Sequence, residues 1–445
     1  MKEERKRMGH PIKKKAGITL VSLVITIIVL LILAGVAINL AIDEEGLIGK
    51  AEESVESWNS AVGEESNVIK NILMKANEIE GGVTGGGGDD ITYVGDVPVP
   101  KGYTASQISN EDSEAEGLVI YEIPKEAKVN WTDNKDSNGK NQSTITIEGN
   151  TTNLQETVNQ YVWIPVDINS MVMCENNNKL ADENGNKICN IVYNEKANTL
   201  TCQTHSDTAT NLVGRLYIGT YSNTRDEDGN RIYSYTMDFT KRDQTYNTSS
   251  YNEPNTVSSD SSNSITIDQL KSDFTAMAKS VAKNGGFYIS RYEVGAGGSS
   301  KRGQPVLTAA SGDGTNYSGA NTWYGLYNTI KNSGANKQMI WGCQYDQVIK
   351  FIGEPAQDGH SDRNLTEDHA LSGQNEEDCM RNIYDLEGNH YEWTAEAYST
   401  HSRANRGSYY GSASYSNFYP ASDRSNYRSP TNSSVDSSSR ATLYL

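Results

Sequence analysis

The stretch from Ile18 to Ile42 constrains this chain more than any other, because it is a long apolar run without a charged residue. A run of this length can cross a bilayer as one helix, and it exceeds the apolar core of a cleaved secretory signal. Lys and Arg residues precede it and acidic residues follow it directly, so the positive-inside rule places the N-terminus in the cytoplasm. We therefore expect a single membrane span over 18–42, rather than a buried core helix, with the bulk of the chain extracellular.

The residues KKKAG, followed by ITLVSLVITIIVLLILAGVAI, resemble the start of type IV prepilins and pseudopilins. In that family a membrane peptidase cuts after the glycine, so the resemblance implies a leader over 1–17 and cleavage between Gly17 and Ile18. The resemblance also implies prepilin peptidase and other pilins as partners. The fifth mature residue is usually Glu in this family and is Ser22 here, which argues against efficient filament assembly.

Apolar residues continue at alternating steps of three and four from Ile48 to Ile79, which is the spacing of an amphipathic helix that packs against a partner. The sequence EGGVTGGGGDD at 80–90 then predicts a flexible connection. We expect a membrane and stalk helix over 18–80, a Gly-rich linker over 81–95, and one large domain over 96–445 with an inserted loop-rich segment over 170–265.

The formal net charge of −18 argues against nucleic-acid binding. Short strand-like pieces are scattered through the large domain, at 161–166, 188–193, 214–221 and 285–295. Thr266 and Gln269 form a capping-box pattern before a helical spacing of apolar residues, and a second helix is expected over 345–353. DENGN (182–186) and DEDGN (226–230) lack the final Glu of a calcium loop and fit hairpin turns. These features predict an α+β fold class.

Five cysteines lie beyond the apolar run, at positions 174, 189, 202, 343 and 379. A disulfide among the first three and free buried thiols are both compatible with this pattern. No CxxC or HxxxH spacing supports a zinc site.

The segment NIYDLEGNHYEWT, residues 382–394, places carboxylates and amides close together: Asp385, Glu387, Asn389 and Glu392. Such oxygen ligands suit calcium, although a hairpin with solvent-facing acids would give the same pattern.

With its neighbours, this segment resembles the formylglycine-generating (sulfatase-modifying) enzyme family. The matching residues are Asn382 through Trp393, then Arg406-Gly407, then Arg424 and Arg440, with GGFYISRYEVG upstream. The resemblance covers roughly residues 160–445 and implies a C-type-lectin-like fold, with calcium bound by Asn389 and Glu392. The family's oxidase chemistry needs a pair of cysteines near the C-terminal end, and no cysteine follows Cys379. We therefore expect no catalytic residues.

The last stretch, 405–445, contains no Lys or Glu and is rich in Tyr, Ser and Asn, as binding loops of antibodies are. It also resembles the variable proteins of diversity-generating retroelements, which use this fold and in which Asn codons are rewritten at adenines. A fixed Tyr/Ser-rich binding surface would look the same. The predicted ligand-binding residues are Tyr409, Tyr410, Ser412, Ser414, Tyr415, Asn417, Phe418, Tyr419, Asp423, Asn426, Tyr427, Asn432 and Asp436.

Three functions follow. The first is a surface-displayed adhesin or receptor that binds an extracellular protein or glycan. The second is a surface oxidase of the formylglycine-generating type, and the third is a structural pilin subunit. We favour the first, because the terminal cysteine site is missing and Ser22 replaces the usual Glu.

Overall fold

The computed structural model describes part of the chain, all of it within one compact unit that spans Gly88–Leu445. The described residues are 91–174, 191–202, 212–214, 216–225, 231–238, 265–308, 322–353, 371–386, 388–399, 402–409, 421, 427–428, 430 and 435–445.

The core of this unit is a six-stranded antiparallel sheet, with strands in the order β16, β23, β15, β8, β4, β3. In chain order these strands are β3 (Tyr103–Ala105), β4 (Val119–Glu122), β8 (Gln160–Pro165), β15 (Gly286–Ser290), β16 (Lys337–Met339) and β23 (Ala441–Leu443). Successive residues of β8 from Gln160 to Ile164 are all buried, so the centre of the sheet is covered on both faces. The last strand, β23, lies between β15 and β16, which fixes the C-terminal end of the chain in the core.

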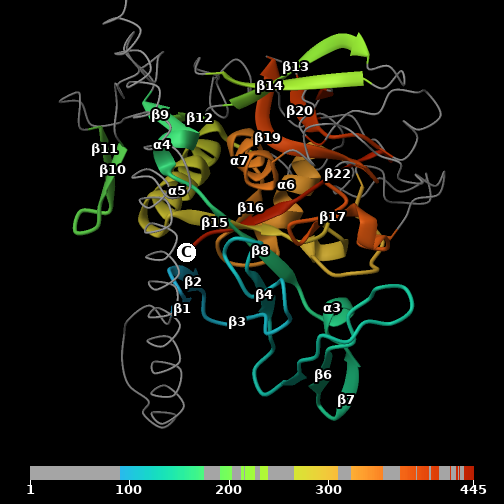
Figure 1. Ribbon diagram of the computed structural model, residues 1–445. Coiled ribbons are helices and arrows are strands. Elements are labelled where there is room, and N and C mark those ends of the chain that lie inside the picture. The colour runs from blue at the N-terminus through green and yellow to red at the C-terminus, as the bar shows by residue number, and fades with distance from the viewer. Residues whose placement is uncertain are drawn as a thin grey trace, which may run out of the picture. The chain divides into compact units, whose positions relative to one another are not determined.

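Three long helices lie beside this sheet: α5 (Ile267–Asn284), α6 (Trp323–Asn332) and α7 (Gly342–Ile352) (Figure 1). The hydroxyl of Thr266 accepts a hydrogen bond from the Gln269 N–H at the start of α5, and Gly285 ends that helix in the left-handed conformation (φ 74°). The α5 helix packs against β15, and α6 packs against β16. Among the described residues there are also short helical turns: α3 (Leu154–Thr157), α4 (Ile168–Met171), η3 (Ala296–Gly298) and η6 (Glu376–Asp378).

A second sheet of four strands is built only from residues after 390, in the order β21, β20, β19, β22. Its strands are β19 (Tyr391–Ser399), β20 (Ser402–Arg406), β21 (Tyr427–Arg428) and β22 (Ser437–Ser439). The β19–β22 pair is parallel, while the other neighbouring pairs are antiparallel. This sheet therefore combines the 382–394 motif with parts of the 405–445 segment.

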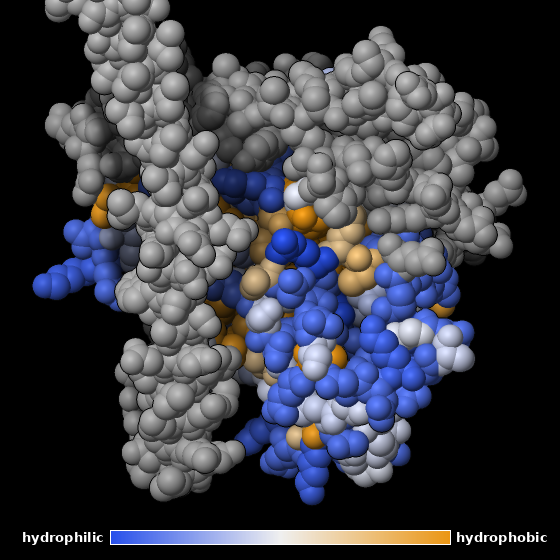
Figure 2. All heavy atoms as spheres, viewed as in Figure 1, coloured by the Kyte–Doolittle hydropathy of each residue, from blue (hydrophilic) through white to orange (hydrophobic). Residues whose placement is uncertain are grey.

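Smaller sheets surround these two. A three-stranded sheet holds β5 (Lys128–Asn130), β6 (Thr144–Ile147) and β7 (Asn150–Asn153), and its region of the surface is mainly hydrophilic (Figure 2). Two-stranded pairs are β1 (Thr92–Val94) with β2 (Val97–Val99), β9 (Val172–Cys174) with β12 (Leu212–Gly214), β10 (Ile191–Asn194) with β11 (Thr199–Cys202), β13 (Leu216–Arg225) with β14 (Arg231–Asp238), and β17 (Cys379–Met380) with β18 (Ile383–Tyr384).

The predicted α+β class is confirmed, as are the helix that follows Thr266 and the helix over 345–353, which begins earlier, at Gly342. Strands β13 and β14, which flank 226–230 in the sequence, pair antiparallel. The predicted turns themselves, 182–186 and 226–230, lie outside the described residues. Strand β1 begins at Thr92, inside the stretch predicted as the linker.

The predicted leader, cleavage site, membrane span and stalk, residues 1–80, lie outside the described residues. Among the helices that are described, none is long and apolar enough to span a membrane. Cys343 is buried and Cys379 is partly buried, and both are free thiols. The pairing of the three earlier cysteines stays a prediction.

Candidate functional site

The 382–394 motif runs from β18 through a tight turn into β19. Asp385 and Asn389 adopt positive φ angles of 58° and 63° in this turn, a conformation that Asp and Asn tolerate better than most residues. Asp385, Asn389 and Glu392 are all buried. A hairpin with solvent-facing acids is therefore the wrong interpretation of these three residues, because the turn points their side chains into the protein. Glu387 lies outside the described residues.

The buried acids of the motif meet a further acid, Glu293, which follows β15. The amide nitrogen of Asn389 donates to Glu293 Oε2, and the Gly373 N–H donates to Asp385 Oδ2 at 2.6 Å. Burial raises the pKa of Glu293 to about 8 and that of Asp385 to about 7. Sequence reasoning missed Glu293, although it belongs to the GGFYISRYEVG stretch that carried the family resemblance.

Arg440 is the cation that faces this acid cluster. Its Nε donates to Glu392 Oε1, its Nη1 donates to the Ser290 and Arg291 carbonyls, and its Nη2 donates to the Tyr384 carbonyl. Arg440 and Glu392 are both fully buried, so this pair is shielded from solvent. It connects the end of the 405–445 segment to both the core sheet and the motif.

Three buried oxygen atoms of this cluster accept no hydrogen bond: Glu293 Oε1, Asn389 Oδ1 and Glu392 Oε2. Hard oxygen atoms without partners are what a calcium ion would use, so the donor chemistry fits the predicted ion. The described His, Cys, Asp and Glu side chains do not by themselves form a group of three that could hold a metal. A calcium ion here would therefore also need the Asn389 oxygen and main-chain carbonyls.

The beginning of the 405–445 segment is held by a second buried ion pair. Arg406 Nη2 lies 2.6 Å from Asp346 Oδ1 of α7, and both side chains are fully buried. The Arg406 guanidinium also lies over the Tyr345 ring, 4.8 Å from its centre. Just before the segment, buried Arg403 lies over the Trp323 ring of α6 at 5.2 Å.

Most predicted ligand-binding residues lie outside the described residues: Tyr410, Ser412, Ser414, Tyr415, Asn417, Phe418, Tyr419, Asp423, Asn426 and Asn432. Tyr427 is placed as part of β21. Tyr409 is partly buried, with its ring centre 4.9 Å from that of Tyr391, and Asp436 is also partly buried. Arg406, Gly407 and Arg440, which carried the family resemblance, are buried.

The serines at 437–439 are core residues, although their composition is that of a surface. All three are fully buried on β22, which pairs with the start of β19. Ser439 Oγ donates to the Trp393 carbonyl at 2.8 Å, and Ser438 Oγ donates to the Leu307 carbonyl at 3.0 Å. Ser437 Oγ instead donates to Asp436 Oδ1 at 3.1 Å. Small hydroxyls fit here because each one has a hydrogen-bond acceptor within the protein.

No family model matches this sequence, and no curated protein matches it. Among solved structures, a chain described as Major Tropism Determinant U1 Variant is similar, with 12% sequence identity and a TM-score of 0.27. The match covers 80% of this chain and 87% of that chain. A TM-score at this level does not establish a shared fold.

Proposed function

We propose that this chain is a non-catalytic surface receptor or adhesin, in which a C-type-lectin-like domain presents the 405–445 segment to an extracellular protein or glycan. One observation carries the proposal: the two ends of that segment are held by fully buried ion pairs, Arg406 with Asp346 and Arg440 with Glu392. The segment is thus fixed at both ends to α7 and to the 382–394 motif.

This arrangement supports binding because the contacts that stabilise the domain lie at the two ends of the 405–445 segment. The side chains between the ends can then vary without loss of stability. Buried charge pairs and the backbone pairing of β20 and β22 with β19 hold the ends whatever side chains lie between them. The residues between are mainly Tyr, Ser and Asn, which give rigid contact area and adaptable hydrogen bonds. The absence of Lys and Glu supports the further proposal that a retroelement rewrites Asn codons here.

The membrane attachment and cell-surface location are proposals that rest on the sequence of 18–42 and on KKKAG before Ile18. On this proposal, prepilin peptidase removes the leader and the domain is displayed outside the cell, alone or on a pilus.

Calcium binding is proposed at Asn389 and Glu392, with Glu293 as a further ligand. Each of these three residues has a buried oxygen that accepts no hydrogen bond, which supports it. The ring nitrogen His390 Nδ1 lies 3.5 Å from Glu293 Oε1. The ion would supply positive charge to a cluster in which Arg440 faces the carboxylates of Glu293, Asp385 and Glu392. It would thereby stabilise the site where the end of the 405–445 segment meets the motif.

A display library tests the proposed function. The predicted ligand-binding positions are randomised to Tyr, Ser, Asn, Asp, Phe, Ala and Gly, and the displayed domain is selected against hen lysozyme, a protein with no relation to the chain. The proposal expects folded clones that bind lysozyme specifically. The matched control library randomises exposed positions of β5 and β7 and should yield no binders. Equal yields from both libraries, or loss of folding across the first, would contradict the proposal.

A further inference from the structure

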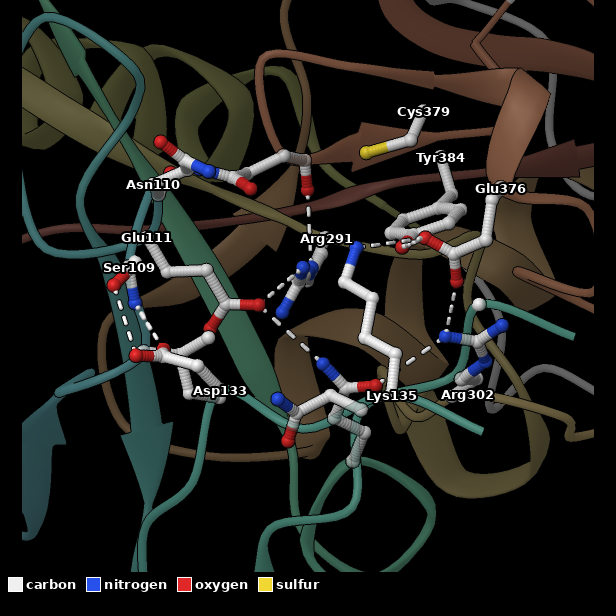
Figure 3. Close-up of a pocket in the computed structure, with 15 residues that line it drawn as sticks. Ser109, Asn110, Glu111, Asp133, Lys135, Arg291, Arg302, Glu376, Cys379 and Tyr384 are labelled. Carbon is white, nitrogen blue, oxygen red and sulfur yellow. Dashed lines mark hydrogen bonds and ion pairs between the residues drawn. The ribbon is translucent and has the colours of Figure 1, made fainter. Parts of the chain in front are cut away.

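A polar cavity of about 250 Å³ lies where segments far apart in the sequence meet (Figure 3). Its walls come from residues 108–111 before β4, from 133–141 between β5 and β6, and from 376–384, together with Gln155, Arg291 and Arg302. None of its lining residues belongs to the 405–445 segment, so it is a separate site from the proposed binding face.

The charges of the inner wall are already balanced. Arg291 Nη2 lies 2.7 Å from Glu111 Oε1, and both side chains are almost completely buried. The Nη1 group of Arg291 donates to Tyr121 Oη and to Gln160 Oε1, and its Nε donates to the Asn382 carbonyl. Arg291 therefore acts as a neutralised, fixed part of the wall.

The lining as a whole carries no net charge, because its acids and bases are equal in number: Glu111, Asp133 and Glu376 against Lys135, Arg291 and Arg302. Arg302 Nη1 lies 2.6 Å from Glu376 Oε1, and Lys135 Nζ lies 3.9 Å from Glu376 Oε2. Both oxygens of Asp133 accept hydrogen bonds from Ser109, from its N–H at 2.7 Å and from its hydroxyl at 3.0 Å. A ligand with a net charge would upset this overall balance, and an uncompensated charge is costly in a partly buried site.

Hydrogen-bonding capacity nevertheless remains in the cavity. Arg302 is only 6% exposed, and its hydrogen bond to Gln155 and its ion pair with Glu376 are both made by Nη1. A guanidinium has five N–H donors, so Arg302 can also donate to a ligand in the cavity. The Glu111 carboxylate already accepts four hydrogen bonds, from Ser106, Tyr121, Gln155 and Arg291. Glu376 accepts from the Tyr384 hydroxyl and pairs with Arg302, so it keeps lone pairs for a ligand, since an ionised carboxylate can accept about four hydrogen bonds. The cavity thus offers both donors and acceptors without an unbalanced charge.

We propose that this cavity binds a small, uncharged, hydroxyl-rich molecule, specifically one sugar unit of a glycan. Its volume is below the roughly 300–1,000 Å³ of pockets that enclose drug-sized ligands, which favours a ligand of single-ring size. Hydroxyl groups match the wall because each can donate to a carboxylate and accept from Arg302, and hydrogen bonds to charged groups are the stronger kind.

The reactivity of the Cys379 thiol can report ligand binding, because Cys379 lines the cavity and a bound ligand would shield it. Cys343 is buried and does not line the cavity. The full-length chain in detergent is titrated with glucose, galactose, mannose and N-acetylglucosamine, and binding is measured by saturation-transfer NMR. N-ethylmaleimide labelling at pH 8.5 is then followed for each cysteine by peptide mass spectrometry. We expect at least one sugar to bind and to slow the labelling of Cys379 with the same concentration dependence.

Two variants complete the test. Arg302→Gln should weaken sugar binding by about tenfold or more, since it removes charged donors to the ligand. Lys135→Gln changes an exposed side chain at the cavity rim, so it should weaken sugar binding less than Arg302→Gln does and leave the core undisturbed. Lys196→Gln, on the β10–β11 turn, is the matched control and should leave sugar binding unchanged. The proposal is overturned if no sugar binds, if glycine or inorganic phosphate protects Cys379 instead, or if a sugar binds without protecting Cys379.

Discussion

Removing one partner of the buried Arg406–Asp346 pair should destabilise the domain strongly. Both side chains are fully buried at 2.6 Å, so Asp346→Leu leaves the Arg406 guanidinium in the core without its closest carboxylate. Loss of one partner from a buried ion pair typically costs about 3–5 kcal/mol. The same loss is expected for Arg406→Met, which leaves the Asp346 charge uncompensated.

The double variant Asp346→Leu with Arg406→Met should be more stable than either single variant. Replacing a whole buried pair with apolar side chains of similar size is often close to neutral, because no buried charge remains. The two changes should therefore be far from additive. The Arg406 contact with the Tyr345 ring is lost in the double variant, so some loss should persist.

Urea unfolding of residues 88–445, followed by tryptophan fluorescence, measures these differences. The matched control is the pair Lys140–Glu156, whose side chains are 27% and 46% exposed and whose coupling should stay below about 1 kcal/mol. The reasoning is refuted if either single variant at 346 or 406 behaves like this exposed pair, or if the double variant loses the sum of the two single losses.

Three further predictions concern processing, calcium and pH. Mass spectrometry of membrane-extracted protein should find Ile18 as the N-terminus, whereas an intact Met1 would indicate an uncleaved signal anchor. The melting temperature of chelated protein should rise with added calcium, because an ion that binds only the folded state stabilises it, and Asn389→Ala should abolish the rise while Asn150→Ala should not. Burial raises the folded-state pKa of Glu293 from 4.5 to about 8. The folded state thus holds this proton more tightly than the unfolded state, and the stability it contributes is lost as the pH rises from about 4.5 to about 8. With a chelator present, the stability of the folded state should therefore decline as the pH rises through that range, and Glu293→Gln should make the decline smaller. If the variant and the unchanged protein show the same dependence of stability on pH, Glu293 does not titrate there.

The sequence predicted the parts of the fold that local patterns determine. Helix α5 was recognisable from its Thr266 cap, its apolar spacing and its terminal Gly285. Helix α6 was missed, although Thr322 caps it and its aromatic residues share one buried face. Its pattern was obscured because tyrosines, which often lie at surfaces, form much of that face.

The candidate site was only half predictable, because its contacts join residues far apart in the chain. The motif around Asn389 and Glu392 could be found locally, but its partners Glu293 and Arg440 come from other segments. The burial of Ser437–Ser439 could not be predicted from composition, since it depends on parallel pairing with β19. The cavity likewise could not be predicted, because its lining residues come from segments far apart in the chain.

The central claim is that the tyrosines between the two ion pairs serve binding and not folding. It is tested most directly by the melting temperature of residues 88–445 after Tyr410, Tyr415 and Tyr419 are changed together to Ser, with Trp393→Ala as the comparison. The account predicts a melting temperature close to that of the unchanged domain for the triple variant, since exposed substitutions usually cost within about 0.5 kcal/mol each. It predicts severe loss for Trp393→Ala, because Trp393 is fully buried and large-to-small changes at such positions cost about 3–5 kcal/mol. A triple variant that melts as low as Trp393→Ala would contradict the account, because those tyrosines would then be part of the core.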